Sequence, residues 1–153
     1  MNKNFQLVQT SDISESYKYF IVFRLNEKRY ALSIKNVIEI ISIPQLETTG
    51  IMPKNVIGIF NYNGMMINVV DLCGFLNEER KNITINNKLM IVAVEGNCFA
   101  LHVNQVENVT KFDTANIQDV PFNMANSILK EIYKTEDDVI GIFAVSNLVT
   151  FST

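Results

Sequence analysis

Two ten-residue segments, one in each half of the chain, carry the same pattern. Residues 31–40 read Ala-Leu-Ser-Ile-Lys-Asn-Val-Ile-Glu-Ile, and residues 100–109 read Ala-Leu-His-Val-Asn-Gln-Val-Glu-Asn-Val. The Ala-Leu pair, the following aliphatic residue, the amide-valine step and the closing aliphatic residue recur in register. A unit of this size cannot bury both faces of its sheet alone, so two units are expected to share an apolar layer. The repeat therefore predicts a two-lobed molecule with a groove between the lobes.

The local pattern is that of an all-β protein. Apolar stretches are short, rich in Ile, Val, Phe and Tyr, and interrupted by turn residues about every ten positions. The strongest local signal is Asn63-Gly64, which predicts a two-residue type I′ hairpin turn because both positions need a positive φ. Short helical turns are expected after Ser33, Asp71 and Ser146, whose side chains can accept hydrogen bonds from free backbone N–H groups. A tight turn is expected at Gly96-Asn97, and residues 113–126 are expected to be loop.

Composition narrows the classes of function. The chain has 153 residues, of which 48% are hydrophobic, and a net charge of −3, whereas sequence-independent nucleic-acid binding needs a net basic face. No apolar run reaches membrane-spanning length, and the N-terminal residues lack the apolar segment of a secretory signal. A cytoplasmic protein that neither inserts directly into a membrane nor binds nucleic acid is expected.

Residues that could carry catalytic or metal chemistry are sparse. The sequence has no phosphate-binding glycine loop, no nucleophile elbow and no metal motif. Cys73, Cys98 and the single histidine, His102, are too few and too scattered for a disulfide framework or a zinc site, and are expected to be structural. We therefore expect no enzymatic activity and no cofactor.

Several motifs in order resemble the CheW-like domain. They are Val-Ile-Glu-Ile at 37–40, Ile-Met-Pro at 51–53, Val-Ile-Gly-Ile-Phe-Asn-Tyr-Asn-Gly at 56–64, Ile-Asn-Val-Val-Asp-Leu at 67–72, and the second-half block from residue 100. The likeness implies two small five-stranded β-barrels packed around a shared core, with short helical turns. It divides the chain into a polar tail, 1–18, and a domain, 19–153, with barrels at about 19–82 and 83–153 between which strands can be exchanged.

The resemblance also implies a function and partners. CheW-like proteins are non-catalytic adaptors that couple chemoreceptors to the histidine kinase CheA in chemotaxis. The expected partners are the C-terminal regulatory domain of CheA and the cytoplasmic tip of a methyl-accepting chemoreceptor, the latter in the groove between the barrels. Carried over residue by residue, the receptor-binding positions are Val37, Glu39, Asn63 and Gly64, and the adjoining partner surface includes Gly58 and Met65.

One departure from the family pattern lies in the hairpin. Where the family usually has Asn-x-Arg-Gly, this chain has Asn61-Tyr62-Asn63-Gly64, so no guanidinium is available to pair with a carboxylate such as Glu39. Taken alone, Glu39 reads as an ordinary solvent-facing strand carboxylate, and with the resemblance a binding role is equally favoured. Gly58 within a strand predicts a bulge or a close backbone approach, which would serve packing and a partner equally well.

Two alternatives remain at this point. The missing arginine is compatible with a CheW-like adaptor of a non-motility signalling array. From a different class, a small β-barrel could bind single-stranded nucleic acid, which needs aromatic residues interleaved with Lys and Arg. Lys28-Arg29-Tyr30 and Arg80-Lys81 are the local hints of that kind, and the acidic balance of the chain opposes them.

Overall fold

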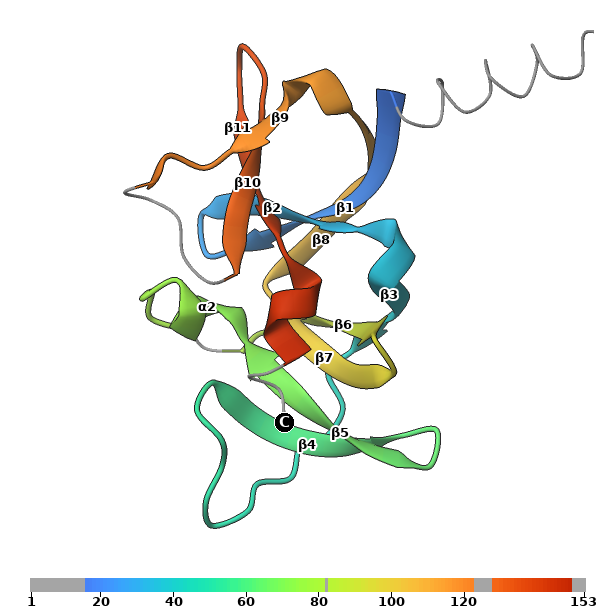
Figure 1. Ribbon diagram of the computed structural model, residues 1–153. Coiled ribbons are helices and arrows are strands. Elements are labelled where there is room, and N and C mark those ends of the chain that lie inside the picture. Colours follow the sequence, from blue (N-terminus) through green and yellow to red (C-terminus); the bar gives the residue numbers. More distant parts are fainter. Residues whose placement is uncertain (1–15, 82, 123–127, 150–153) are drawn as a thin grey trace, which may run out of the picture.

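The computed structural model describes residues 16–81, 83–122 and 128–149, which form two β-sheets (Figure 1). Sheet A has six strands in the order β8 (Gln105–Asp113), β1 (Tyr17–Leu25), β2 (Lys28–Ser33), β11 (Val139–Phe143), β10 (Leu129–Lys134) and β9 (Ile117–Asp119). Sheet B has five strands in the order β3 (Val37–Ser42), β6 (Lys88–Val94), β7 (Asn97–Val103), β5 (Met65–Asp71) and β4 (Val56–Tyr62). The short helices are η1 (Ile34–Asn36), α2 (Leu72–Phe75), η2 (Thr114–Asn116) and η4 (Val145–Leu148).

Each sheet combines strands from both halves of the chain. The β1–β2 hairpin of the first half lies between β8 and β11, and the β6–β7 hairpin of the second half lies between β3 and β5. The order β3-β6-β7-β5-β4 thus matches β8-β1-β2-β11-β10 strand for strand. The repeated alanines occupy equivalent parallel pairings, Ala31 opposite Ile142 and Ala100 opposite Val69. The sequence repeat is therefore a repeat of topology in which the two halves have exchanged hairpins.

Both sheets curl toward barrels, as expected, but their described ladders do not close. In sheet B, the chain beyond β3 reaches β4, where Glu47 and Ile59 exchange two backbone hydrogen bonds of 2.8 Å. In sheet A, the chain beyond β8 passes through η2 into β9, which pairs with β10. In each lobe, the continuation of one edge strand thus reaches the strand at the opposite edge. The all-β, two-lobed fold class is confirmed, with curled sheets of six and five strands in place of two closed five-stranded barrels.

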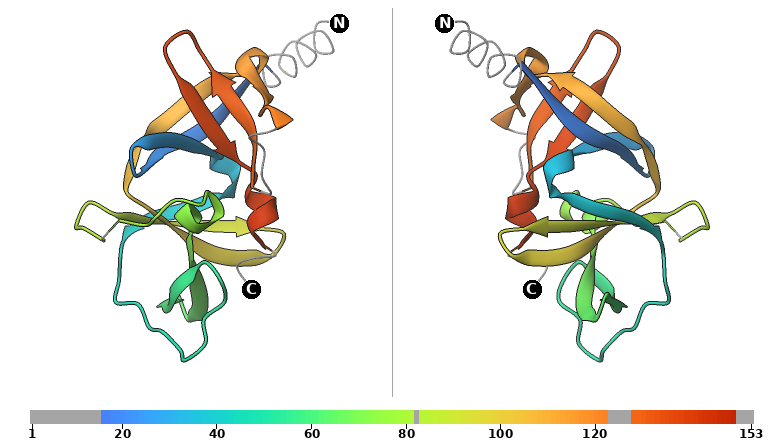
Figure 2. Two further views of the ribbon diagram at one scale, coloured as in Figure 1. Left: turned by 90° about the vertical axis from the view of Figure 1, so that its left-hand side faces the viewer. Right: turned by 90° about the vertical axis from the view of Figure 1, so that its right-hand side faces the viewer.

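The buried apolar residues form three layers, one inside each curled sheet and one between the two sheets. Strand alternation decides which residue enters which layer. In β1, Phe20 and Val22 face the interior of sheet A, while Ile21 and Phe23 face a central layer between the sheets. In β6, Leu89 and Ile91 fill the interior of sheet B, while Met90 and Val92 join the same central layer. The predicted shared layer is confirmed, and Figure 2 shows the two lobes stacked across it.

Two of the expected helical turns form with the expected caps. Ser33 Oγ accepts a hydrogen bond from the backbone N–H of Lys35 at 3.4 Å before η1, and Asp71 Oδ1 accepts from that of Cys73 at 3.0 Å before α2. In the described ranges, no helix has the length and apolar character needed to span a bilayer.

Candidate functional site

The β4–β5 hairpin has the turn that its sequence predicts. Tyr62 pairs with Met65, which leaves Asn63 and Gly64 as a two-residue turn with φ values of 51° and 86°. The Asn61 Oδ1 atom accepts a hydrogen bond of 2.9 Å from the backbone N–H of Gly64. This bond and the Tyr62–Met65 pairing define the backbone of the hairpin tip.

Glu39 lies beside this hairpin and is held by Tyr62. The Glu39 side chain is exposed on β3, and its Oε2 accepts a hydrogen bond of 2.5 Å from the Tyr62 hydroxyl group. The bond joins the two edge strands of sheet B. It raises the pKa of Tyr62, because an ionised phenol would lose the bond and face the carboxylate charge. The hydroxyl group of Tyr62 thus contacts Glu39 from the hairpin in which the family usually carries an arginine. The sequence did not indicate this role of Tyr62.

Exposed apolar residues neighbour Glu39 along β3 and Tyr62 along the β4–β5 hairpin. Ile38 is 55% exposed, Met65 50% and Met66 49%, and Ile40 is also exposed. Alternation requires at least one of the two methionines to point away from the core, and both are half exposed because β7 pairs with β5 only from Val69 onward. We call residues 38–40 and 62–66 the hairpin surface.

Two of the predicted site residues are covered by neighbouring segments. Val37 is half buried, opposite Val92, and packs against the central layer. Gly58 is buried at a register shift in the β4–β5 ladder, and a Cβ atom added there would lie 2.9 Å from Leu46 Cβ and 3.2 Å from the Glu47 carbonyl oxygen. The bulge and the close backbone approach predicted for Gly58 are therefore both present. The structure brings Glu39, Asn63, Gly64 and Met65 together, and leaves Val37 and Gly58 less accessible.

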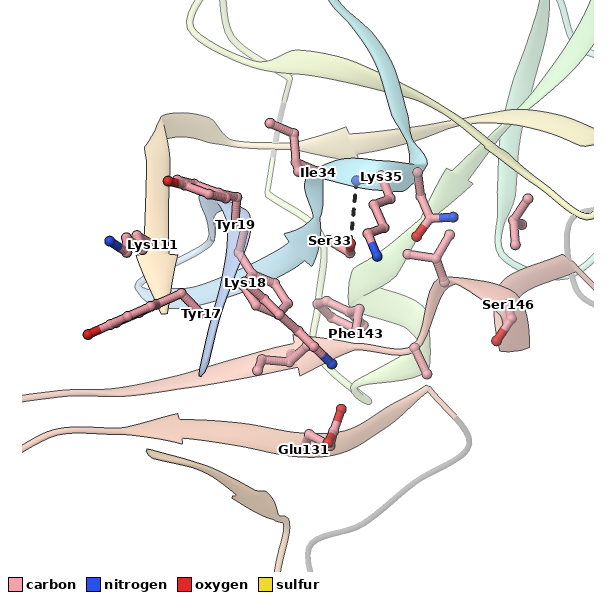
Figure 3. A pocket seen from close by; sticks show the side chains of 16 residues that line it. Tyr17, Lys18, Tyr19, Ser33, Ile34, Lys35, Lys111, Glu131, Phe143 and Ser146 are labelled. Atoms are coloured by element: carbon pink, nitrogen blue, oxygen red, sulfur yellow. Dashed lines mark hydrogen bonds between the residues drawn. The ribbon is translucent and has the colours of Figure 1, made fainter. Parts of the chain in front are cut away.

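A groove of about 770 Å³ lies beside η1 (Figure 3). It is lined by parts of β1, η1, β11 and η4, and by Val94 from sheet B. Its charged lining residues are Lys18, Lys35, Lys111 and Glu131. The η1 part of the groove leads directly into β3, which carries Glu39. The sequence predicted a groove between the lobes and gave no indication of its lysines.

The histidine and the cysteines are packing residues. His102 is 1% exposed, its Nε2 lies 2.8 Å from Asn87 Oδ1, and its pKa is lowered chiefly by burial. Burial is also the main reason that the pKa of Cys73 is raised to about 11, which keeps this thiol protonated and unreactive. Within the described residues, no cluster of three or more His, Cys, Asp or Glu side chains could hold a metal ion.

Comparison with known proteins places this architecture in a family. The family model of the CheW-like domain matches residues 19–152. A search of curated proteins found no match. Among solved structures, the scaffolding protein TtCheW from Thermoanaerobacter tengcongensis is 27% identical over 82% of this chain and 88% of its own, with a TM-score of 0.76. A family match over nearly the whole chain and a fold shared with a CheW scaffold show that this chain belongs to the CheW-like domain family.

Proposed function

We propose that this protein is a non-catalytic cytoplasmic adaptor that couples chemoreceptors to the histidine kinase CheA. The observation that carries the proposal is the hairpin surface: a carboxylate held by a neighbouring hydroxyl group and bordered by exposed apolar side chains, in a CheW-like domain. A few apolar anchors around an oriented polar group are the usual source of affinity in protein interfaces.

The receptor side of the proposal rests on the hairpin surface. Glu39 offers an acceptor whose direction is set by Tyr62, and Met65 offers a flexible apolar contact that can adapt to a partner. Asn63 and Gly64 form the turn that presents them. Family likeness supports Val37 and Gly58 as members of this region, and their burial favours a supporting role behind the contact residues.

The kinase side rests on the two-lobed fold. In this family, the C-terminal regulatory domain of CheA has the same fold as the adaptor, so the two proteins can pair through equivalent ends of their sheets. The matching strand orders support such pairing, because the edge strands β8 and β3 occupy equivalent positions in the two lobes, whereas β9 extends sheet A beyond β10.

Calorimetric titration against the isolated C-terminal domain of CheA tests this function. We expect binding in the micromolar range with equal stoichiometry, and no change when a single-stranded oligonucleotide is added. The control is Met65→Glu, which lies on the hairpin surface and should keep the affinity for the kinase domain while it weakens receptor capture. Absence of binding to the kinase domain by the wild-type protein would contradict the adaptor function.

A further inference from the structure

The turn of the β4–β5 hairpin places a thermolabile residue before a glycine. Asparagine is chemically unstable because the backbone nitrogen of the next residue can attack its side-chain amide carbon. A glycine in the next position leaves that nitrogen uncovered, since it carries no Cβ atom. Asn63 is the only asparagine of the chain that is followed by glycine. The Asn63-Gly64 step is therefore the position in the sequence where this reaction is least hindered.

The fold leaves both reacting groups open to solvent. Asn63 and Gly64 are exposed, and a Cβ atom added at Gly64 would meet no heavy atom within 4 Å beyond its adjacent residues. Figure 1 shows the turn projecting from the body of the molecule at the end of β4 and β5. Strand β5 pairs with β7 only from Val69 onward, so β4 alone holds residues 65–68. A hairpin end that is paired on one side opens more readily than the centre of a sheet.

One hydrogen bond restrains the nitrogen that would attack. The backbone N–H of Gly64 donates to Asn61 Oδ1 at 2.9 Å. Ring closure requires the Asn63 backbone to rotate out of the turn, which breaks this bond. The rotation also relieves the φ of 51° at Asn63, a left-handed conformation that is unfavourable for a residue with a Cβ atom. The Asn61 side chain is thus the main local restraint on the reaction.

Three other asparagines provide an internal comparison. Asn26, Asn55 and Asn77 have φ values of 54°, 65° and 56°, close to that of Asn63. Each of them is followed by glutamate or valine, whose side chain hinders attack by the backbone nitrogen. The backbone conformation is therefore shared by four asparagines, whereas the uncovered nitrogen distinguishes Asn63.

We propose that Asn63 deamidates spontaneously in the folded protein and that the product lowers the affinity of the hairpin surface for the chemoreceptor. The Gly64 nitrogen loses its proton to solvent and forms a bond to Asn63 Cγ. The bond from Cγ to Nδ2 breaks, and Nδ2 takes a proton from water and leaves as ammonia. Water then adds to one of the two carbonyl groups of the cyclic imide, which opens to aspartate or isoaspartate.

The product changes both the charge and the shape of the hairpin surface. A carboxylate replaces a neutral amide next to Tyr62, whose hydroxyl group donates to Glu39 at 2.5 Å. The surface then presents a second negative charge, which a partner that is complementary to one carboxylate leaves uncompensated. Isoaspartate also adds one atom to the backbone, so Tyr62 and Met65 would no longer pair across a regular two-residue turn. The effect on binding rests on the proposed adaptor function, whereas the reaction does not.

Peptide mapping by mass spectrometry tests the modification. The full-length protein is incubated at mildly alkaline pH, and isoaspartate is measured by enzymatic methylation. We expect Asn63 to be the first asparagine converted. Asn61→Ala removes the acceptor of the Gly64 N–H and should accelerate the conversion severalfold. Its matched control, Asn108→Ala, removes an exposed asparagine from β8 and should leave the rate unchanged.

Two results would overturn the modification. One is conversion of another asparagine while Asn63 stays intact. The other is conversion of Asn63 only after the protein has been unfolded in denaturant, which would show that the folded hairpin protects it.

The effect on binding is tested with fresh protein and a soluble receptor cytoplasmic fragment. Asn63→Asp carries the new charge without incubation and should bind the fragment severalfold more weakly than the wild type, with unchanged affinity for the kinase domain. The matched control Asn77→Asp adds the same charge at an exposed asparagine of similar φ beyond α2, and should bind like the wild type. Circular dichroism checks that both variants are folded. Equal receptor affinity of Asn63→Asp and the wild type would overturn the effect on binding.

The two readouts also separate this inference from the adaptor function. If the fresh wild type binds neither the receptor fragment nor the kinase domain, the adaptor function is wrong and the effect on binding falls with it. The peptide map still confirms or overturns the modification in that case, because it does not depend on a partner.

Discussion

Among single residues, Tyr62 has the role that the sequence indicated least. The hairpin sequence shows that Asn63 departs from the family pattern, but it suggests no role for the neighbouring Tyr62. The curl of sheet B brings β3 and β4 together, so that a residue 23 positions away supplies the hydrogen bond to Glu39. Such a contact depends on how far a sheet curls, which residue pattern alone does not indicate.

Removing only the Tyr62 hydroxyl group tests its role. Tyr62→Phe keeps the ring edge that contacts Phe60 but leaves the Glu39 carboxylate free to rotate. We expect receptor affinity to fall severalfold with little change in thermal stability, because the pair is exposed. Titration of the receptor fragment and a thermal melt provide the two readouts, and an unchanged affinity would show that Tyr62 does not orient the contact.

Reversing the charge of Glu39 tests the carboxylate itself. Glu39→Lys should weaken receptor capture and leave folding intact, because the side chain is exposed on an edge strand. Loss of the folded state in circular dichroism would instead make the carboxylate structural.

Substituting the turn residue tests the departure from the family pattern. Asn63→Arg would bring a guanidinium to the hairpin tip, near Glu39, and is expected to strengthen or redirect receptor binding. The positive φ of 51° at this position will cost some stability, which a melt measures separately. Identical receptor affinity and selectivity would exclude position 63 from the contact.

The single histidine predicts a dependence of stability on pH. Burial lowers the pKa of His102 below its ordinary value of 6.5, so the folded protein binds this proton less readily than the unfolded chain. As the pH falls through about 6.5 toward the lowered value, the free energy of unfolding should therefore decrease. Denaturant unfolding at pH about 7 and about 5.5 measures this loss. His102→Gln should reduce it, and an equal loss in the variant would assign the effect to other groups.

At the scale of elements, one hairpin turn and two helix caps could be predicted, whereas a second turn and the short irregular elements could not. The Asn63-Gly64 turn and the caps of η1 and α2 follow local rules. The turn expected at Gly96-Asn97 instead lies at Glu95-Gly96, the two residues with positive φ. Residues 113–126 were expected to be loop, yet they contain η2 and β9. Strand β9 has three residues, which are too few to show an alternation of apolar and polar side chains in the sequence.

One helical cap was predicted wrongly. Ser146 was expected to cap the last helical turn, but η4 begins at Val145 after Ala144, and no side chain caps it. The register of β11, which brings Phe143 and Val145 into the central layer, determines where this turn begins. Tertiary packing here overrides the local preference of serine for a cap.

The absence of a side chain at Gly58 leaves room for Leu46 and Glu47 to approach β4. Gly58→Ala would force a methyl group against Leu46 and the Glu47 carbonyl group, and we expect a loss of about 1–3 kcal/mol in unfolding free energy. Gly50→Ala is the matched control, because a Cβ atom added there would meet no heavy atom within 4 Å beyond its adjacent residues, and the substitution should be nearly neutral. Equal stabilities of the two variants in denaturant titrations would show that the close approach at Gly58 is not needed.

At the scale of the whole molecule, the repeat predicted two lobes and a shared core but not which hairpin belongs to which sheet. The segments Phe20-Ile-Val-Phe23 of β1 and Met90-Ile-Val-Ala93 of β6 have similar apolar patterns. The sequence pattern therefore does not indicate which sheet each hairpin joins. The exchange makes the halves interdependent, because each sheet has a hairpin of the other half at its centre.

Cutting the chain between residues 82 and 83 tests this interdependence. Fragments 1–82 and 83–153 should each lack stable β structure, since each loses the central hairpin of its sheet. Mixing them should restore the circular dichroism of the intact protein. A cooperatively folded single fragment would contradict the exchanged arrangement.

The adaptor function requires that both partners bind at the same time. The most direct measurement is a bridging assay, in which a receptor cytoplasmic fragment is fixed to beads and offered the C-terminal domain of CheA. The account predicts that the kinase domain is retained only when this protein is present, and that Glu39→Lys reduces its retention while direct binding to the kinase domain persists. Retention of the kinase domain that is the same with and without this protein would contradict the account.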